Sequence, residues 1–333
     1  MPVSVLATIA LLIVSAGLIY AACELFVNGV EWLGRKLNMG QTAVGTVLAA
    51  FGTALPESVV TLVAVVTGHD EASKNIGVGA ALGGPLVLST VAYAVVGLSV
   101  LASSRRNGSQ ALTFPHERLS RDQTWFLLIF IVKMALGLIA FAPKPLLGFA
   151  FLIAYALYFW TEVRKEEESE HIDLEPLTFR RKDANPGLGW VLIQTGLALL
   201  VTYLASHLFV EQLGKIGPWA GLSPTVVALL LSPIATELPE TMNAIIWVRQ
   251  GKQRLAVANI SGAMMIQATV PSAFGLLFTR WIFDAPLILS GAITLISITA
   301  MLILLRRRSL TALRLSWFWV FYVAFAVGLI FVR

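Results

Sequence analysis

The sequence predicts an all-α membrane protein, with ten transmembrane helices arranged as two inverted repeats of five helices. Three observations predict this fold: the composition, the placement of basic residues and an internal repeat. Of the 333 residues, 57% are hydrophobic and only 13% are charged, whereas a soluble domain carries about 25% charged residues. A chain of this length holds about ten apolar spans of about 20 residues with short loops. We therefore expect most of its surface to face lipid.

Ten apolar runs, separated by polar breaks, are the candidate spans. The first has no basic segment before it and no small-residue cleavage site, which favours a retained span over a signal peptide. It is long enough to be tilted or to extend past the bilayer. The ten expected spans are residues 3–33, 41–67, 75–101, 124–142, 144–163, 188–214, 223–249, 254–279, 284–305 and 311–331.

The basic residues support this count, because cytoplasmic loops of membrane proteins carry an excess of Lys and Arg. With the N-terminus outside, 18 of the 24 basic residues fall in cytoplasmic loops, five fall outside, and Lys133 lies within a span. Ten spans place both termini outside. The cytoplasmic central loop, residues 164–187, then joins a first repeat, residues 1–163, to a second, residues 188–333. Its cluster of glutamates is typical of a solvated connector; a regulatory cation site is the alternative.

The two halves of the sequence resemble each other. A shift of 183 residues aligns Thr53-Ala54-Leu55-Pro56-Glu57 with Thr236-Glu237-Leu238-Pro239-Glu240, and a shift of 179 residues then aligns Gly83 with Gly262. Five spans, an odd number, separate equivalent points, so the two copies have opposite orientations in the membrane. Inverted repeats of this kind place a substrate site near the membrane midplane, where broken helices meet.

Glu57 and Glu240 lie at equivalent places near the middle of the second and seventh spans. A carboxylate there costs roughly 2.5–3.5 kcal/mol on insertion scales, so an acid within a membrane is by default a functional hypothesis. Structural pairing with a base is the alternative, but Lys133 is the only basic residue deep within a span. Lys133 either neutralises one of the acids or takes the place of a bound cation. We expect the two glutamates to form the functional site.

Each glutamate follows a proline, which cannot donate a hydrogen bond to the carbonyl four residues earlier. The carbonyls of Gly52 and Ala235 are therefore left for a bound cation or a neighbouring helix. Thr53 and Thr236, each four residues before a glutamate, add hydroxyl oxygens on the same helix faces. Carboxylate, hydroxyl and carbonyl oxygens suit Ca²⁺ or Na⁺. One cysteine and four histidines argue against a zinc or copper site.

Two features distinguish the second copy from the first. Glu237 has no acidic counterpart in the first copy, and it is a further cation ligand, a proton carrier or a hydrogen-bonded acid facing another helix. Asn259, Ser261 and Gln267 add oxygens to the eighth span, whereas the equivalent stretch of the third span, residues 79–85, has almost no polar side chain. The glycines of that stretch favour close helix packing over ligation.

The segments Gly52-Thr53-Ala54-Leu55-Pro56-Glu57 and Ala235-Thr236-Glu237-Leu238-Pro239-Glu240 resemble the alpha repeats of the calcium/cation antiporter superfamily, which includes sodium/calcium exchangers. The plan of five plus five spans is also similar to that family, so the resemblance covers nearly the whole chain. It implies that the glutamate after Leu-Pro in each copy binds Ca²⁺ and Na⁺, with a contribution from the nearby threonine. Those roles fall on Glu57, Glu240, Thr53 and Thr236.

The sequence departs from the usual motifs of that family at two places. Ala54 and Glu237 replace the serine of Gly-Thr-Ser-Leu-Pro-Glu. Both copies of the companion motif Gly-Asn-x-x-Gly-Ser-Asn lack the final asparagine, with Pro85 and Met264 in its place. An added acid and fewer neutral ligands leave proton coupling, or a cation other than Ca²⁺, open.

We expect a secondary active antiporter that exchanges a divalent cation, Ca²⁺ in the leading hypothesis, for Na⁺ or H⁺ by alternating access. The alternatives are a proton-coupled exchanger of another cation and a degenerate protein that binds cations without transporting them. An enzyme is not expected, because we find no recognisable nucleophile–base pair and no His-Glu-x-x-His motif. The expected partners are the lipid bilayer, in a bacterial or archaeal plasma membrane, and inorganic cations. We expect no cofactor, no nucleic acid and no obligate protein partner.

Overall fold

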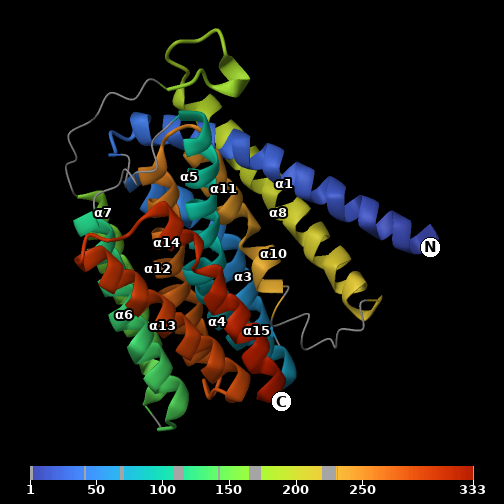
Figure 1. Ribbon diagram of the computed structural model, residues 1–333, viewed down its shortest axis with the longest axis vertical. Helices are drawn as coiled ribbons and strands as arrows, with labels where there is room; N and C mark the ends of the chain where they lie inside the picture. Colours follow the sequence, from blue (N-terminus) through green and yellow to red (C-terminus); the bar gives the residue numbers. More distant parts are fainter. Residues whose placement is uncertain are drawn as a thin grey trace.

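The computed structural model describes residues 3–40, 43–67, 71–107, 116–141, 143–164, 174–219, 230 and 232–332. In these ranges all regular secondary structure is helical (Figure 1). Seven of the helical stretches described there are long and apolar enough to cross a membrane, as expected of an integral membrane protein. They are Val5–Lys36, Val78–Ser103, Lys144–Val163, Leu188–Phe209, Gln253–Phe278, Ala285–Arg306 and Ala312–Phe331.

The helices of the first half overlap the first five expected spans. They are α1 (Val3–Lys36); η1 (Val44–Ala49) with α3 (Ala50–Thr67); α4 (Glu71–Val87), η2 (Leu88–Ala92) and α5 (Tyr93–Asn107) in one continuous stretch; α6 (His116–Leu138); and η3 (Lys144–Leu146) with α7 (Leu147–Val163).

The helices of the second half overlap the other five. They are α8 (Leu188–Trp219); α10 (Ser232–Thr236) with α11 (Leu238–Arg249); α12 (Gln253–Phe278); α13 (Ala285–Arg306); and α14 (Ala312–Ser316) with α15 (Trp319–Phe331). A short turn, η4 (Thr178–Arg180), lies in the connector between the halves. The first part of the expected seventh span, including residues 223–229, lies outside the described residues.

The fourth expected span began too late, since α6 begins at His116 and not at residue 124. Two arginines in its first turns, Arg118 and Arg121, pair with the buried Glu162 of α7 at 2.8 and 3.1 Å. Charge-assisted pairs of this kind satisfy a charged helix end. The helix therefore extends beyond the apolar run, and hydropathy alone does not predict its first residue.

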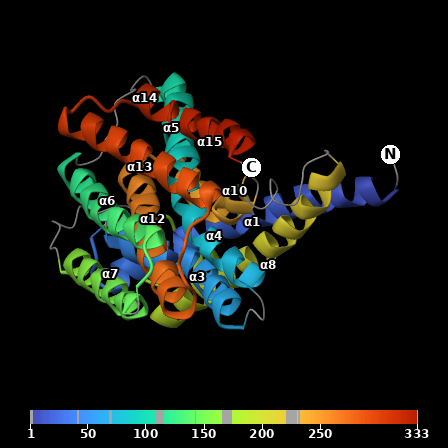
Figure 2. The same ribbon diagram turned by 90° about the horizontal axis from the view of Figure 1, so that it is seen from below.

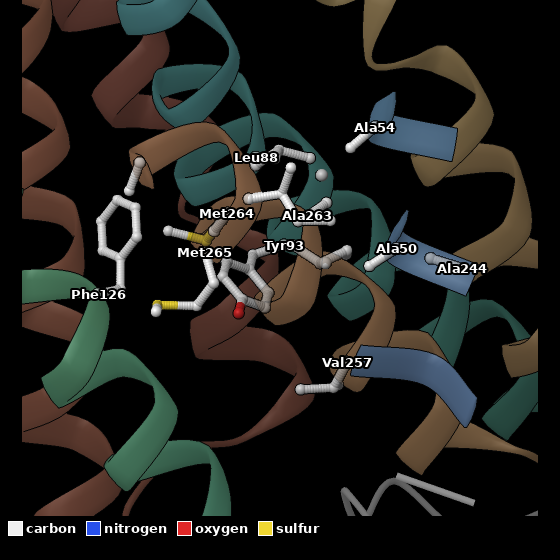
Figure 3. Packing of buried hydrophobic residues seen from close by; sticks show 14 of the residues in the cluster. Ala50, Ala54, Leu88, Tyr93, Phe126, Ala244, Val257, Ala263, Met264 and Met265 are labelled. Atoms are coloured by element: carbon white, nitrogen blue, oxygen red, sulfur yellow. The ribbon is translucent and has the colours of Figure 1, made fainter. Parts of the chain in front are cut away.

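α12 lies in the interior of the bundle (Figure 2), where it packs against α3, α4, α6, α7 and α11. Glycines permit its close approach to η1. A Cβ on Gly45 would lie 2.7 Å from that of Ala258, and a Cβ on Gly262 would overlap the carbonyl of Thr46. Small, sulfur-containing and aromatic side chains, among them Met264, fill the surrounding core (Figure 3).

Several interior helices are interrupted. η1 and η2 are π-helical turns that run directly into α-helices, and such turns occur frequently at functional sites. Pro85 lies within α4 and Pro271 within α12. α10 and α11 meet at Glu237, whose φ of −86° and ψ of 8° depart from α-helical values. Backbone carbonyls freed inside a membrane need a new donor or a cation.

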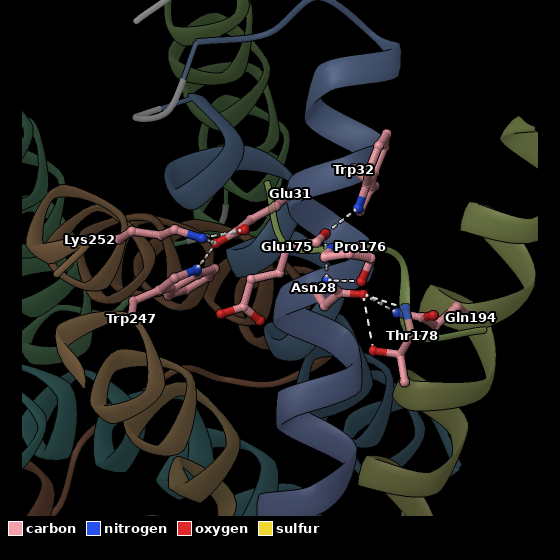
Figure 4. Close-up of polar contacts among 9 residues, drawn as sticks. All are labelled: Asn28, Glu31, Trp32, Glu175, Pro176, Thr178, Gln194, Trp247 and Lys252. Carbon is pink, nitrogen blue, oxygen red and sulfur yellow. Dashed lines mark hydrogen bonds and ion pairs between the residues drawn. The ribbon is translucent and has the colours of Figure 1, made fainter. Parts of the chain in front are cut away.

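α1 and α8 pack along each other and extend beyond the rest of the bundle on one side (Figure 1). Towards the opposite end, the Asn28 amide of α1 accepts from Gln194 Nε2 of α8 at 2.8 Å (Figure 4). It also donates to the carbonyls of Glu175 and Pro176 and accepts from the backbone N–H of Thr178. The second part of the connector is thus fastened to both helices.

A second polar contact joins α1 to the start of α12 (Figure 4). Glu31 is buried and accepts from Trp247 Nε1 at 2.9 Å and from Lys252 Nζ at 2.5 Å. Because Lys252 is the N-cap of α12, this pair fixes one end of the interior helix relative to α1.

Candidate cation-binding site

The acidic motif of the second half lies at the junction of α10 and α11. Pro239, in the first turn of α11, has no N–H to donate to the carbonyl of Ala235. The expected helix break beside Glu240 is therefore present in the backbone. Cys23 of α1 approaches the same turn and donates weakly from Sγ to the carbonyl of Pro239, at 3.8 Å.

Glu237 and Glu240 are both completely buried. Glu237 lies in the junction itself, and its Oε1 accepts from Gln267 Nε2 of α12 at 2.5 Å. Gly84 of α4 leaves room for this contact, because a Cβ there would lie 2.6 Å from Glu237 Oε1 and would overlap the amide of Gln267. Elements from both halves of the chain thus meet at Glu237.

Glu240 lies among amide side chains. Asn259 of α12 donates from Nδ2 to the backbone carbonyl of Glu240 at 3.3 Å. Asn243, one turn further along α11, is on the same helix face as Glu240 and is completely buried. Among the described residues, the Oδ1 atoms of Asn243 and Asn259 have no hydrogen-bond donor. Buried polar atoms are normally paired, so these two oxygens are candidate ligands.

The two threonines of the motifs donate to their own helices. Thr53 Oγ1 donates to the carbonyl of Ala49 at 3.1 Å, and Thr236 Oγ1 donates to that of Pro233 at 3.2 Å. A hydroxyl that donates in this way keeps its oxygen lone pairs for another partner. Both threonines therefore keep an oxygen that can contact a cation.

The first acidic motif is carried by α3, which packs against α11 and α12. Gly52 lies against the ring of Phe26, because a Cβ on Gly52 would lie 3.1 Å from Phe26 Cζ. Glu57 belongs to α3, but its side chain lies outside the described residues, as does that of Ala235. The backbones of the two motifs are thus on neighbouring helices.

Ser261 belongs to a different polar contact. Gln123 of α6 donates to Ser261 Oγ at 3.1 Å and to the hydroxyl of Tyr93 at 2.7 Å. The structure joins Ser261 to α5 and α6, and no described contact joins it to Glu237 or Glu240.

Sequence reasoning misses Asn243. Its only signal is its spacing, three residues after Glu240 on an apolar helix, which places an amide on the face of the acid. That spacing would have been a reason to include it with the candidate ligands.

Comparisons with known proteins place these features in context. The family model described as sodium/calcium exchanger protein matches residues 7–163 and 190–331. Inner membrane protein YrbG of Escherichia coli is 26% identical over 267 residues, which cover 78% of this chain and 77% of YrbG. CaxA of Alkalimonas amylolytica, described as a candidate antiporter, is 27% identical over 285 residues, which cover 84% of this chain and 83% of CaxA.

The fold is also similar to solved structures. A structure of the sodium-calcium exchanger NCX_Mj, soaked with Na⁺ and Sr²⁺, matches with a TM-score of 0.75. The match covers 97% of this chain and 98% of that chain, at 20% sequence identity. At this identity the likeness shows a shared fold.

Proposed function

The chain belongs to the sodium/calcium exchanger protein family, and from this premise we propose that it is a secondary active cation antiporter. It exchanges a divalent cation, Ca²⁺, for Na⁺ or H⁺ by alternating access. The observation that carries the proposal is the pair of buried amide oxygens of Asn243 and Asn259 beside the buried Glu240.

This set of atoms has the chemistry of a site for a hard cation. Ca²⁺ takes about six to eight oxygen ligands from carboxylates, amides, backbone carbonyls and water. Glu240 supplies a carboxylate, and Asn243 and Asn259 supply amide oxygens. Among the described residues the Oδ1 atoms of Asn243 and Asn259 have no donor. Leaving amide oxygens buried without a partner is unfavourable, so a cation that enters and leaves repeatedly suits them.

The first half supplies the rest of the proposed site. Glu57, Thr53 and Gly52 stand at the positions of the repeat that correspond to Glu240, Thr236 and Ala235. The packing of α3 against α11 supports this assignment. Glu57 and Glu240 hold either the divalent cation or the ions exchanged for it, but not both at the same time. Binding of the divalent cation therefore excludes binding of the exchanged ions.

The proposal includes ten transmembrane segments in two inverted repeats, residues 1–163 and 188–333. It places both termini outside and the connector, residues 164–187, in the cytoplasm. The excess of basic residues in the assigned cytoplasmic loops supports this orientation.

Reciprocal packing supports the inverted repeat. Gly83 of α4 approaches Pro233 of α10, with 2.7 Å between a Cβ at the glycine and the proline ring. Gly262 of α12, the equivalent of Gly83, approaches Thr46 of η1. Each companion-motif glycine therefore packs against the helix that leads to the acidic motif of the other half.

Proton coupling is the second candidate, and the surroundings of Glu237 favour it. This acid is completely buried, and the amide of Gln267 holds one of its oxygens. A buried acid at a helix break, close to the ligands of the divalent cation, is suited to carry a proton through the membrane.

Glu240→Gln tests the proposed site. In protein reconstituted into vesicles, Ca²⁺ uptake driven by a Na⁺ or pH gradient should fall about 100-fold or more, because losing one partner of a buried charged contact costs roughly 3 kcal/mol. Glu57→Gln should have the same effect. Replacing Ca²⁺ by Mn²⁺ or Mg²⁺ in the same assay identifies the divalent cation.

Glu211→Gln is the matched control, because Glu211 of α8 is an exposed acid whose only described ion pair is with Lys215. Its uptake should equal that of the wild type. Full uptake by folded Glu57→Gln and Glu240→Gln proteins would exclude the site, and Ca²⁺ binding by the wild type without any flux would identify a protein that binds cations without transporting them.

A further inference from the structure

Lys133 is a completely buried base within α6. Its Nζ donates to the backbone carbonyl of Ala81 in α4 at 2.5 Å and to that of Gln267 in α12 at 3.4 Å. It forms no ion pair with any carboxylate that the structure describes. The contacts of the ammonium group therefore do not support the idea that Lys133 neutralises an acid directly.

Both of these carbonyls belong to helix turns that a proline interrupts. In an α-helix, the carbonyl of residue i accepts from the N–H of residue i+4. That residue is Pro85 for Ala81 and Pro271 for Gln267, and proline has no N–H. Lys133 thus donates to the two carbonyls that the prolines of α4 and α12 leave without their helical donors.

Two aromatic rings near the ammonium group also favour a cation at this position. Nζ lies 5.1 Å from the ring centre of Phe130 and 6.0 Å from that of Trp281, distances at which an aromatic face attracts a cation. Carbonyls at helix breaks are the ligands that transporters with inverted repeats offer to Na⁺. The ammonium group therefore occupies a position whose ligands suit a monovalent cation.

This position is connected to the candidate cation-binding site. Gln267, whose carbonyl accepts from Lys133, donates through its side chain to Glu237. Gly84, three residues after Ala81, lies against the same carboxylate. Gln267 therefore contacts both groups, with its carbonyl at Lys133 and its side chain at Glu237.

We propose that Lys133 is a tethered cation that replaces one mobile monovalent cation between α4 and α12. Its ammonium group fills the ligands that Na⁺ would otherwise use, and its charge balances part of the charge of the buried acids. The inference rests on the proposed function and sharpens it. Each transport cycle moves one coupling cation fewer than the same site would move without the lysine.

Two substitutions at this position separate charge from packing. Lys133→Met removes the charge, and Lys133→Arg retains it. In the purified protein, equilibrium dialysis with radioactive Na⁺ should find one more bound Na⁺ per molecule in Lys133→Met than in the wild type. Lys133→Arg should bind the wild-type number. Thermal unfolding should show Lys133→Met destabilised in N-methylglucamine and restored by Na⁺, because Na⁺ enters between the two carbonyls.

A further variant removes the ligands while keeping the methionine. Pro85→Ala and Pro271→Ala give both carbonyls a backbone N–H again. When these two changes are combined with Lys133→Met, the additional Na⁺ should not bind, and Na⁺ should no longer restore stability. A simple packing role for Lys133 predicts no such dependence on the prolines.

The outcomes that overturn the proposal are distinct. The proposal is refuted if Lys133→Met binds only the wild-type number of Na⁺ ions. It is also refuted if Lys133→Met does not fold in either Na⁺ or N-methylglucamine. In vesicles, the reversal potential should show one more coupling cation per divalent cation in Lys133→Met, and an unchanged ratio also refutes it. If the wild type shows no gradient-driven flux, only the proposed antiport is refuted. The proposal for Lys133 is tested separately, because equilibrium dialysis counts bound Na⁺ without transport.

Discussion

α4 and α12 occupy equivalent places in the internal repeat, yet they present different chemistry to the interior. α12 brings the buried amides of Asn259 and Gln267. α4 brings Gly84, whose missing side chain makes room for Glu237, and the carbonyl of Ala81, which Lys133 holds. One half of the repeat therefore provides buried amide side chains, whereas the other provides space and a backbone oxygen.

The acid that only the second half carries gives the largest expected effect. If Glu237 carries the coupling proton, Glu237→Gln should lower Ca²⁺ uptake driven by a pH gradient, without Na⁺, to the level of empty vesicles. The new amide still fits beside Gln267 but cannot release a proton. Full pH-driven uptake by the folded variant would show that the additional acid of the second half does not carry the proton.

Gly84 of α4, which leaves space beside Glu237, gives the second-largest expected effect. Gly84→Ala places a methyl group against Glu237 and Gln267, and overpacking of this kind costs about 2 kcal/mol, or about 30-fold in transport. Gly79→Ala is the control on the same helix, because nothing lies within 4 Å of a Cβ there. Vesicle uptake at several Ca²⁺ concentrations measures both variants. Equal rates for the two would mean that α4 does not need its glycine beside the acid.

The smallest effect concerns a single ligand of α12. Asn259→Ala removes an oxygen beside Glu240, and the apparent Ca²⁺ affinity in the vesicle assay should fall about tenfold, for a loss of roughly 1.4 kcal/mol. Ser261→Ala, two residues along the same helix, should change the affinity little, because Ser261 contacts Gln123 of α6. A larger loss in Ser261→Ala than in Asn259→Ala would reverse the assignment of ligands within α12.

The helices whose limits follow apolar runs could be predicted closely from the sequence. α13 was expected at residues 284–305 and comprises Ala285–Arg306. The start of α6 could not be predicted, because it depends on ion pairs between its arginines and Glu162, a residue 41 positions or more away. Local patterns define an apolar span, but distant partners decide how far its charged end remains helical.

The site shows the same limit. The lost hydrogen bond before Glu240 could be predicted, because Pro239 has no N–H. The break itself could not, because the equivalent Pro56 lies within the continuous helix α3. The partners of Lys133 could not, although both prolines are visible in the sequence, because its contacts depend on how α4, α6 and α12 pack. Ser261 was also expected among the ligands, but its described partner is Gln123, a contact that depends on the same packing. The role of Glu57 stays a prediction.

The position of Cys23 has a practical consequence. This residue is the only cysteine of the chain, and its sulfur touches the proline turn that carries Glu240. A thiol-reactive label added to the native sequence therefore reports on this turn alone, with no background from elsewhere. Its rate of labelling from each side of the membrane would reveal from which side a reagent reaches this buried turn, without any engineered residue.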